Sequence, residues 1–156
     1  MGALGKGRSF FPAGGEEVRE LVVAGIAVDE ESGGPVLLLR DPAEKNHFVP
    51  LRIGEAEAMS IVLGLRGEPT PRPLTHDLLL SVLTALEATL EEVSLDRLEE
   101  GICYASLHIR RPGGERVQVD ARPSDSVALA IRSGSPILIE EEVYEELVQE
   151  IPGFMP

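Results

Sequence analysis

The stretch that decides the fold is Val117–Ser133, VQVDARPSDSVALAIRS, in which a strand pattern passes directly into a helix pattern. Pro123 cannot continue a strand ladder, and apolar residues then recur at helical spacing. Ser124 is a favoured N-cap, and Asp125 complements the positive end of the helix dipole. The sequence therefore predicts a strand-to-helix junction that gathers three charged residues, Asp120, Arg122 and Asp125.

Two interpretations of these charges stay open. In the first, Ser124 and Asp125 only cap the helix while Arg122 pairs with Asp120, and no functional site is needed. In the second, the junction is one half of a functional site, and a similar junction is then required elsewhere in the chain.

A similar junction lies at Val49–Leu65, VPLRIGEAEAMSIVLGL, where a short apolar strand, a breaker and an acidic first helical turn precede an apolar helix. Laid over the first stretch without gaps, Glu57 falls on Asp125. The chain is therefore predicted to be α+β, with two βββα-like units around a mixed or antiparallel sheet and a possible internal repeat. The other strand-like runs are Leu21–Val28, Val36–Arg40, Val93–Leu98 and Ile102–Arg110.

The remaining segments complete a single domain. Residues 1–17 are rich in glycine and aperiodic and are predicted to be a flexible N-terminal arm, residues 18–150 the folded domain, and residues 151–156 a C-terminal tail. A strand and an acidic helix are expected at the C-terminal end. Between the two units, the spacing predicts an amphipathic helix over Thr75–Leu90 whose core-facing residues are Leu79, Val82, Leu83, Leu86 and Leu90.

Composition limits the possible functions. The 156 residues are 43% hydrophobic and 26% charged, which is typical of a globular domain. No apolar run approaches the roughly 20 residues of a membrane span, so a cytoplasmic protein without membrane contact is expected. The net charge of −13 opposes binding to phosphate backbones unless a metal ion or a few arginines neutralise the substrate locally. The single cysteine, Cys103, excludes a disulfide within one chain.

The segment Arg72–Asp77, RPLTHD, is the one place where a histidine and an acid stand together at a predicted helix start. A functional site would use His76 and Asp77 for acid–base chemistry. The alternative is that Asp77 only complements the helix dipole and His76 is a surface residue.

Three separated motifs, IGEAEAMSI, RPLTHDLL and DARPSDSVALAIRSGSPI, together resemble the bifunctional nuclease (BFN) domain family. The resemblance covers roughly residues 18–146. It implies an α+β domain that associates as a homo-oligomer, with a dimer expected, and a nuclease activity on DNA and RNA as described for plant relatives. The motif positions in this chain are Glu55, Glu57, Arg72, His76, Asp77, Asp120, Arg122, Ser124 and Asp125.

Roles for these positions follow from the needs of phosphodiester hydrolysis, which are an activated water, charge stabilisation and help for the leaving oxygen. Arg72 or Arg122 would clamp the phosphate, and His76, oriented by Asp77, would act as base or acid. Glu55 and Ser124 complete the candidate catalytic set, and no organic cofactor is expected. One divalent ion, Mg²⁺ or Mn²⁺, would be held by Glu57, Asp120 and Asp125.

Two other functions stay open. In the first, the chain is a non-catalytic homo-oligomeric binding or regulatory module, whose junction charges form a structural ion-pair network. In the second, it is a domain for a small phosphate-bearing ligand. A nuclease predicts a contiguous positive track beside the acids, and the local patch that could begin one is Arg110, Arg111 and Arg116 on a hairpin.

Overall fold

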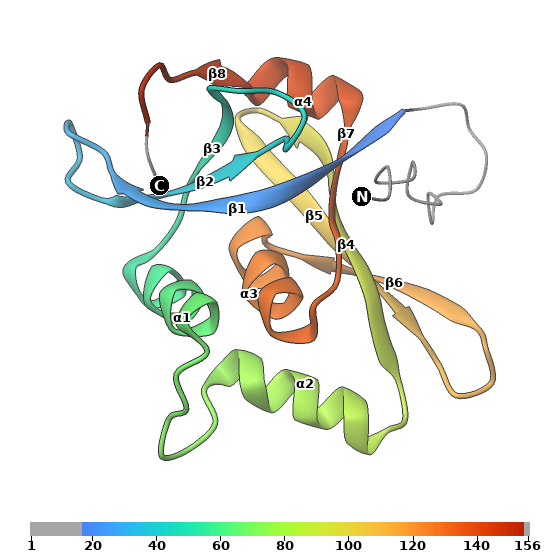
Figure 1. The fold of residues 1–156 in the computed structure, drawn as a ribbon. Coiled ribbons are helices and arrows are strands. Elements are labelled where there is room, and N and C mark those ends of the chain that lie inside the picture. The colour runs from blue at the N-terminus through green and yellow to red at the C-terminus, as the bar shows by residue number, and fades with distance from the viewer. Residues whose placement is uncertain (1–16, 155–156) are drawn as a thin grey trace.

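Two antiparallel meanders build most of the sheet in the computed structural model, which describes residues 17–154 (Figure 1). Each meander consists of three consecutive strands joined by short turns, the arrangement that the two βββα-like units predict. The first contains β1 (Val18–Val28), β2 (Pro35–Arg40) and β3 (His47–Arg52), and the second contains β4 (Thr89–Glu99), β5 (Ile102–Arg110) and β6 (Arg116–Ala121).

A single short strand joins the two meanders. β7 (Ile137–Glu140) lies between them, antiparallel to β1 and parallel to β4, and β8 (Gln149–Glu150) pairs with β3 at the edge. The result is one eight-stranded sheet in the order β6-β5-β4-β7-β1-β2-β3-β8. Because one pair is parallel and the others antiparallel, the sheet is mixed, and the α+β prediction is confirmed.

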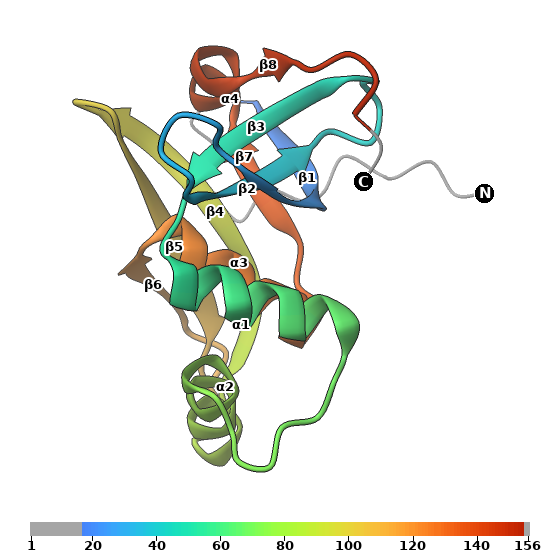
Figure 2. The same cartoon turned by 90° about the vertical axis from the view of Figure 1, so that its left-hand side faces the viewer.

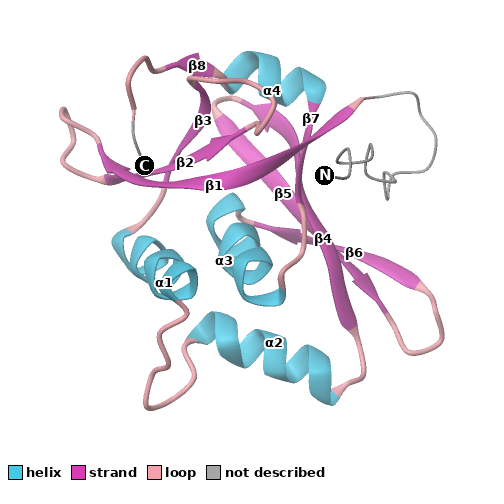
Figure 3. Cartoon of the chain, in the orientation of Figure 1, coloured by secondary structure: helices cyan, strands magenta, loops and turns pink. Residues whose placement is uncertain are grey.

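Each meander leads directly into a helix. α1 (Glu55–Arg66) follows β3 and α3 (Pro123–Ser133) follows β6, while α2 (Thr75–Ala85) lies between the units and α4 (Glu141–Leu147) follows β7. Figure 3 shows α1, α2 and α3 gathered at one end of the molecule and α4 at the other. The N-cap of α3 is Arg122, with proline at the first helical position, so the prediction that Ser124 is the N-cap is wrong.

The core is one contiguous apolar cluster between the sheet and these helices. α3 contributes its central turn, Val127–Ala130, in which every residue is at most 1% exposed. Large-to-small substitutions at such positions typically cost 2–5 kcal/mol, so α3 is firmly held. The side chains at its N-terminus therefore project from a rigid support.

α2 packs differently from the prediction. Leu80 and Leu83 face the core, whereas Leu79, Val82 and Leu86 are 39%, 44% and 65% exposed. The helix carries apolar residues on two faces, Leu80 and Leu83 on one and Leu78 and Val82 on the other, so the spacing fits either face and tertiary packing decides between them. Figure 2 shows α2 below α1, on the side away from β1, β2 and β3.

The described chain reaches from Glu17 to Phe154. The predicted N-terminal arm lies, apart from Glu17, outside the described residues. At the other end, Phe154 packs edge-on against Phe48 with ring centroids 5.2 Å apart, and the amide of Ile151 donates to the carbonyl of Asn46. Within residues 17–154, no helix is long and apolar enough to cross a membrane.

Candidate functional site

The two strand-to-helix junctions meet in space because α1 and α3 pack against each other. Glu57 and Asp125 each occupy the third position of their helix, as the internal repeat predicts. One guanidinium joins them: Arg122 Nε donates to Asp125 Oδ2 over 2.9 Å, and Arg122 Nη2 donates to Glu57 Oε1 over 3.1 Å. The interpretation that Arg122 pairs with Asp120 is therefore wrong.

His76 extends this group toward the interior. Its Nε2 lies 2.9 Å from Asp125 Oδ1, and its Nδ1 lies 2.6 Å from Ser60 Oγ. A carboxylate only accepts, so Nε2 donates to Asp125, and in the neutral ring Nδ1 accepts from the Ser60 hydroxyl. We call the five linked residues the junction cluster: Glu57, Ser60, His76, Arg122 and Asp125.

Exposure within the junction cluster sets which groups can meet a ligand. His76 and Ser60 are buried, at 8% and 7% exposed, and both ring nitrogens of His76 are engaged. The Asp125 side chain is 31% exposed and that of Arg122 is 66% exposed. Asp125 and Arg122 therefore face solvent, while His76 stands behind Asp125 and fixes its orientation.

The pKa values of the outer pair fit an ionised bridge. Burial alone would raise the pKa of the Asp125 carboxyl, but hydrogen bonds from Arg122 and His76, with the Arg122 charge, lower it below its usual value. Hydrogen bonding to Asp125 and the nearby carboxylate charges raise the pKa of Arg122. A carboxylate with a lowered pKa is better suited to holding a cation than to accepting a proton.

Asp77 is predicted to orient His76, but its hydrogen-bond partners are Leu74 and Arg132. Its Oδ2 accepts from the Leu74 amide over 2.9 Å, and its Oδ1 accepts from Arg132 Nε over 2.8 Å. Burial would raise the pKa of Asp77, but these hydrogen bonds and the Arg132 charge lower it. Asp77 therefore fixes the start of α2 and does not touch the ring of His76.

Arg132 is the functional neighbour that the sequence analysis missed. Its side chain is 9% exposed and also donates to the carbonyls of Ser60, over 2.9 Å, and Ala128, over 3.0 Å. It thereby ties α1, α2 and α3 together directly behind the junction cluster. The available signal was a basic residue in the last turn of α3, which is equally typical of a dipole complement.

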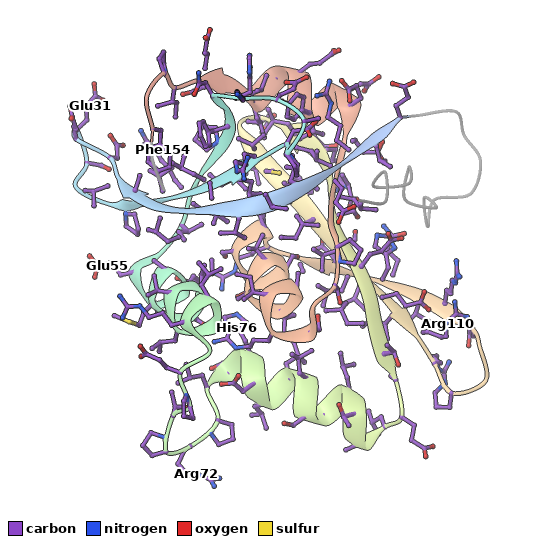
Figure 4. All side chains as sticks on the ribbon, viewed as in Figure 1. Glu31, Glu55, Arg72, His76, Arg110 and Phe154 are labelled. Atoms are coloured by element: carbon purple, nitrogen blue, oxygen red, sulfur yellow. The ribbon has the colours of Figure 1, made fainter. Side chains whose placement is uncertain are left out.

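Three more of the predicted residues, besides Asp77, lie outside the junction cluster. Figure 4 shows Arg72 at the tip of the α1–α2 loop and Glu55 at the outer side of α1, both pointing away from His76. Asp120 lies opposite Ser106 in the β5–β6 pair, and its neighbour Ala121 packs on the core. Because side chains alternate along a strand, Asp120 faces the other side of the sheet.

The predicted three-acid metal set is thus not assembled here, and residues 17–154 contain no group of three or more His, Cys, Asp or Glu side chains that could hold a metal ion. Glu57 and Asp125 are nevertheless two carboxylates joined through one cation. Mg²⁺ is often bound by one or two carboxylates together with water and substrate phosphates, so the donor chemistry of this pair fits such an ion.

A cleft of about 590 Å³ opens beside Arg122. It lies where the β3–α1 junction, the β4–β5 hairpin, the β6–α3 junction and the end of α4 meet. Ser124, the last predicted catalytic residue, lines this cleft and is 7% exposed. The cleft is lined by Pro50, Leu51, Arg52, Ile53, Gly54, Leu98, Gly101, Ile102, Cys103, Arg122, Pro123, Ser124 and Leu147.

Comparisons of the sequence with known proteins identify its family. The sequence model of the bifunctional nuclease domain matches residues 37–152, which include both junctions and all of α2. Two proteins from strains of Mycobacterium tuberculosis, "Uncharacterized protein MT1877" and "Uncharacterized protein Rv1829", are each 44% identical over 133 residues, covering 85% of this chain and 78% of the relative. The chain therefore belongs to the bifunctional nuclease domain family.

Proposed function

We propose that this protein is a nuclease that hydrolyses phosphodiester bonds in RNA or DNA at the junction cluster. The observation that carries the proposal is the Arg122 guanidinium held between Glu57 and Asp125, with His76 behind Asp125, at the edge of a cleft. Membership of the family supports the same reaction class. The cytoplasmic location expected from the sequence stays a prediction.

The chain's own residues divide the work by exposure. Arg122, with a side chain 66% exposed, turns from its carboxylates to donate to the phosphoryl oxygens of a bound substrate. His76 keeps Asp125 in place during this movement. Mg²⁺ or Mn²⁺ held by Glu57 and Asp125 would supply charge neutralisation and a water of lowered pKa. Ser124 contributes to the cleft, and Asp77 acts through Arg132 as a positioning residue.

The acidity of the chain is compatible with a local site but not with a long basic track. The hairpin patch predicted as the start of such a track is already ion-paired: Arg110 and Arg116 contact Glu91, and Arg111 Nη1 lies 2.9 Å from Glu115. Phosphate contacts therefore have to come from few residues close to the junction cluster. This favours a substrate held over a short length.

Cleavage of labelled single-stranded RNA and DNA at low salt, with Mg²⁺, Mn²⁺ or EDTA, tests the proposal. Asp125→Asn should abolish cleavage in a folded protein, since it removes the charge that Arg122 and the ion share. Asp120→Asn is the matched control and should leave the rate unchanged. Equal rates in the wild type and Asp125→Asn would indicate a contaminating nuclease, and a folded wild type with no cleavage would leave the regulatory binding module as the better function.

We also propose that the homodimer forms through the exposed apolar face of α2, which consists of Leu78, Leu79, Val82 and Leu86, 39–65% exposed. The segment from Leu78 to Leu86 carries no charged side chain. Two copies of a chain with net charge −13 repel each other, and this face lets them meet without adding repulsion. Leu78, Val82 and Leu86 follow i, i+4, i+8 spacing, so two antiparallel copies of α2 are self-complementary around a two-fold axis.

Light scattering coupled to size-exclusion chromatography measures this interface. The measured molar mass of the wild type should be twice that of the chain. Val82→Glu should have the mass of a monomer, because it places a charge in the centre of the contact. Val28→Glu changes a residue that is 69% exposed in another region and should remain dimeric. A monomeric wild type, or a dimer that survives Val82→Glu, would contradict the proposed interface.

A further inference from the structure

We infer that the cleft beside Arg122 binds the terminal phosphorylated nucleotide of a single-stranded nucleic acid, so that the chain acts at strand ends. The part that concerns cleavage rests on the proposed nuclease function. Nucleotide binding itself does not, because it requires only the cleft.

Two helix N-termini open into this cleft. Gly54, the N-cap of α1, and Arg122, the N-cap of α3, both line it, and neither helix start has a side-chain cap hydrogen bond. The first amides of a helix lack intrahelical acceptors and carry the positive end of the dipole. Two such ends on one cleft favour an anion, and phosphate is the anion that helix N-termini commonly bind.

A serine hydroxyl at the cleft can serve the same ligand. Ser124 lines the cleft and is 7% exposed. Within residues 17–154, its hydroxyl is not among the buried side-chain atoms that lack a partner, so it reaches the solvent of the cleft and is free to donate to a ligand there. A phosphate oxygen in the cleft would accept from this hydroxyl.

Two arginines stand at the rim with freedom to turn. The side chains of Arg52 and Arg122 are 76% and 66% exposed, and both line the cleft. Arg52 Nη2 lies 3.0 Å from Asp29, a surface pair whose geometry costs little to give up. Either guanidinium can therefore follow a phosphate without disturbing the core.

Much of the remaining lining of the cleft is apolar. Ile53, Leu98, Cys103 and Leu147 are partly buried there, and Ile102 is 57% exposed at the hairpin that closes it. Apolar side chains beside an anion site suit a molecule with a flat base and a phosphate. The volume of about 590 Å³ is that of a small-ligand pocket and accommodates one nucleotide but no extended strand.

The restriction to ends follows from the surroundings of the cleft. One nucleotide fills it, and Arg122 at its rim belongs to the junction cluster. The bond that reaches the junction cluster is then the one next to the bound terminal nucleotide. Internal segments of a strand lack an end to insert.

The first experiment measures binding to the full chain by isothermal titration calorimetry with adenosine 5′-monophosphate, adenosine 3′-monophosphate, adenosine and inorganic phosphate. At least one monophosphate should bind about tenfold or more tightly than adenosine and than inorganic phosphate. Ser124→Ala and Ile102→Glu should each weaken it about fivefold or more, the loss of one hydrogen bond or apolar contact. Ser81→Ala, an exposed serine of α2, is the control. Monophosphates that bind no better than adenosine, or equally well to both cleft variants, would overturn the inference.

The second experiment separates this inference from the proposed function. Linear and circular single-stranded DNA of the same sequence are incubated with the wild type. Degradation of the linear form with a resistant circle supports action at ends. Equal cleavage of the linear and the circular DNA would overturn the restriction to strand ends but keep the proposed nuclease function. Monophosphate binding without cleavage of either DNA would support the nucleotide site and refute the nuclease function.

Discussion

The contact between His76 and Asp125 gives the sharpest test of the junction cluster, because it joins α2 to α3 through one hydrogen bond of 2.9 Å. The perturbation is a double-mutant cycle with His76→Ala, Asp125→Ala and the two together. Its readout is the coupling free energy, which removes the cost of deleting either side chain alone.

The expected coupling is worked from burial and charge. A hydrogen bond to a charged group contributes about 1.5–3 kcal/mol when it is well protected. His76 is 8% exposed but the Asp125 side chain is 31% exposed, so solvent screening lowers the value toward about 1–2 kcal/mol. Since the pKa of Asp125 is lowered, the coupling should persist at pH 5 and fall only on acidification below about pH 4.

Urea unfolding of the four proteins, followed by circular dichroism at pH 7 and at pH 3, supplies the numbers. A control cycle pairs His76→Ala with Glu57→Ala, which reaches the histidine only through Arg122 and Asp125 and should couple by less than about 0.5 kcal/mol. A His76–Asp125 coupling no larger than this control would refute the placement of His76 behind Asp125.

Two further changes test the surroundings. In Gly54→Ala the added Cβ would overlap the Glu57 carboxylate, so this carboxylate must shift and cleavage should slow. Gly113→Ala, whose added Cβ meets nothing within 4 Å, is the control. The measurement is the initial rate of cleavage by each variant. Arg132→Leu should lower the free energy of unfolding by about 2 kcal/mol through its two carbonyl partners, with a discounted part from Asp77, whose side chain is 38% exposed. The lowered pKa of Asp77 means that its stabilisation is present above about pH 4 and lost below it, so Asp77→Asn should show a shallower loss in urea unfolding between pH 5 and pH 3.

Much of the fold was accessible from local pattern. Strand alternation and turn residues predict both meanders, and the breaker followed by acids predicts that α1 and α3 begin just before the matching positions Glu57 and Asp125. These signals are local, so they survive without knowledge of the packing. The same patterns could not choose the buried face of α2, because leucines and valine stand on two of its faces.

The site was predictable only in part, for a similar reason. The repeat gives Glu57 and Asp125 equivalent places, and residue chemistry makes Arg122 a candidate phosphate clamp. Whether Asp120 joins them depends on which side of β6 faces the helices, and the partner of His76 depends on how α2 lies across α3. Both depend on tertiary packing, which the sequence pattern does not give. Ser60 was not predicted because a serine within a helix, three residues after Glu57, does not by itself indicate a site.

The departure from two-fold repetition explains how two similar junctions make one site. At equivalent N-cap positions the first unit has Gly54 and the second has Arg122. Glycine leaves room for the Glu57 carboxylate beside its own helix start, and the arginine supplies a cation that both acids share. Two carboxylates against one guanidinium leave the junction cluster with an excess negative charge. A second cation corrects this balance, so cleavage that persists unchanged in EDTA would argue against the carboxylate pair as the reacting centre.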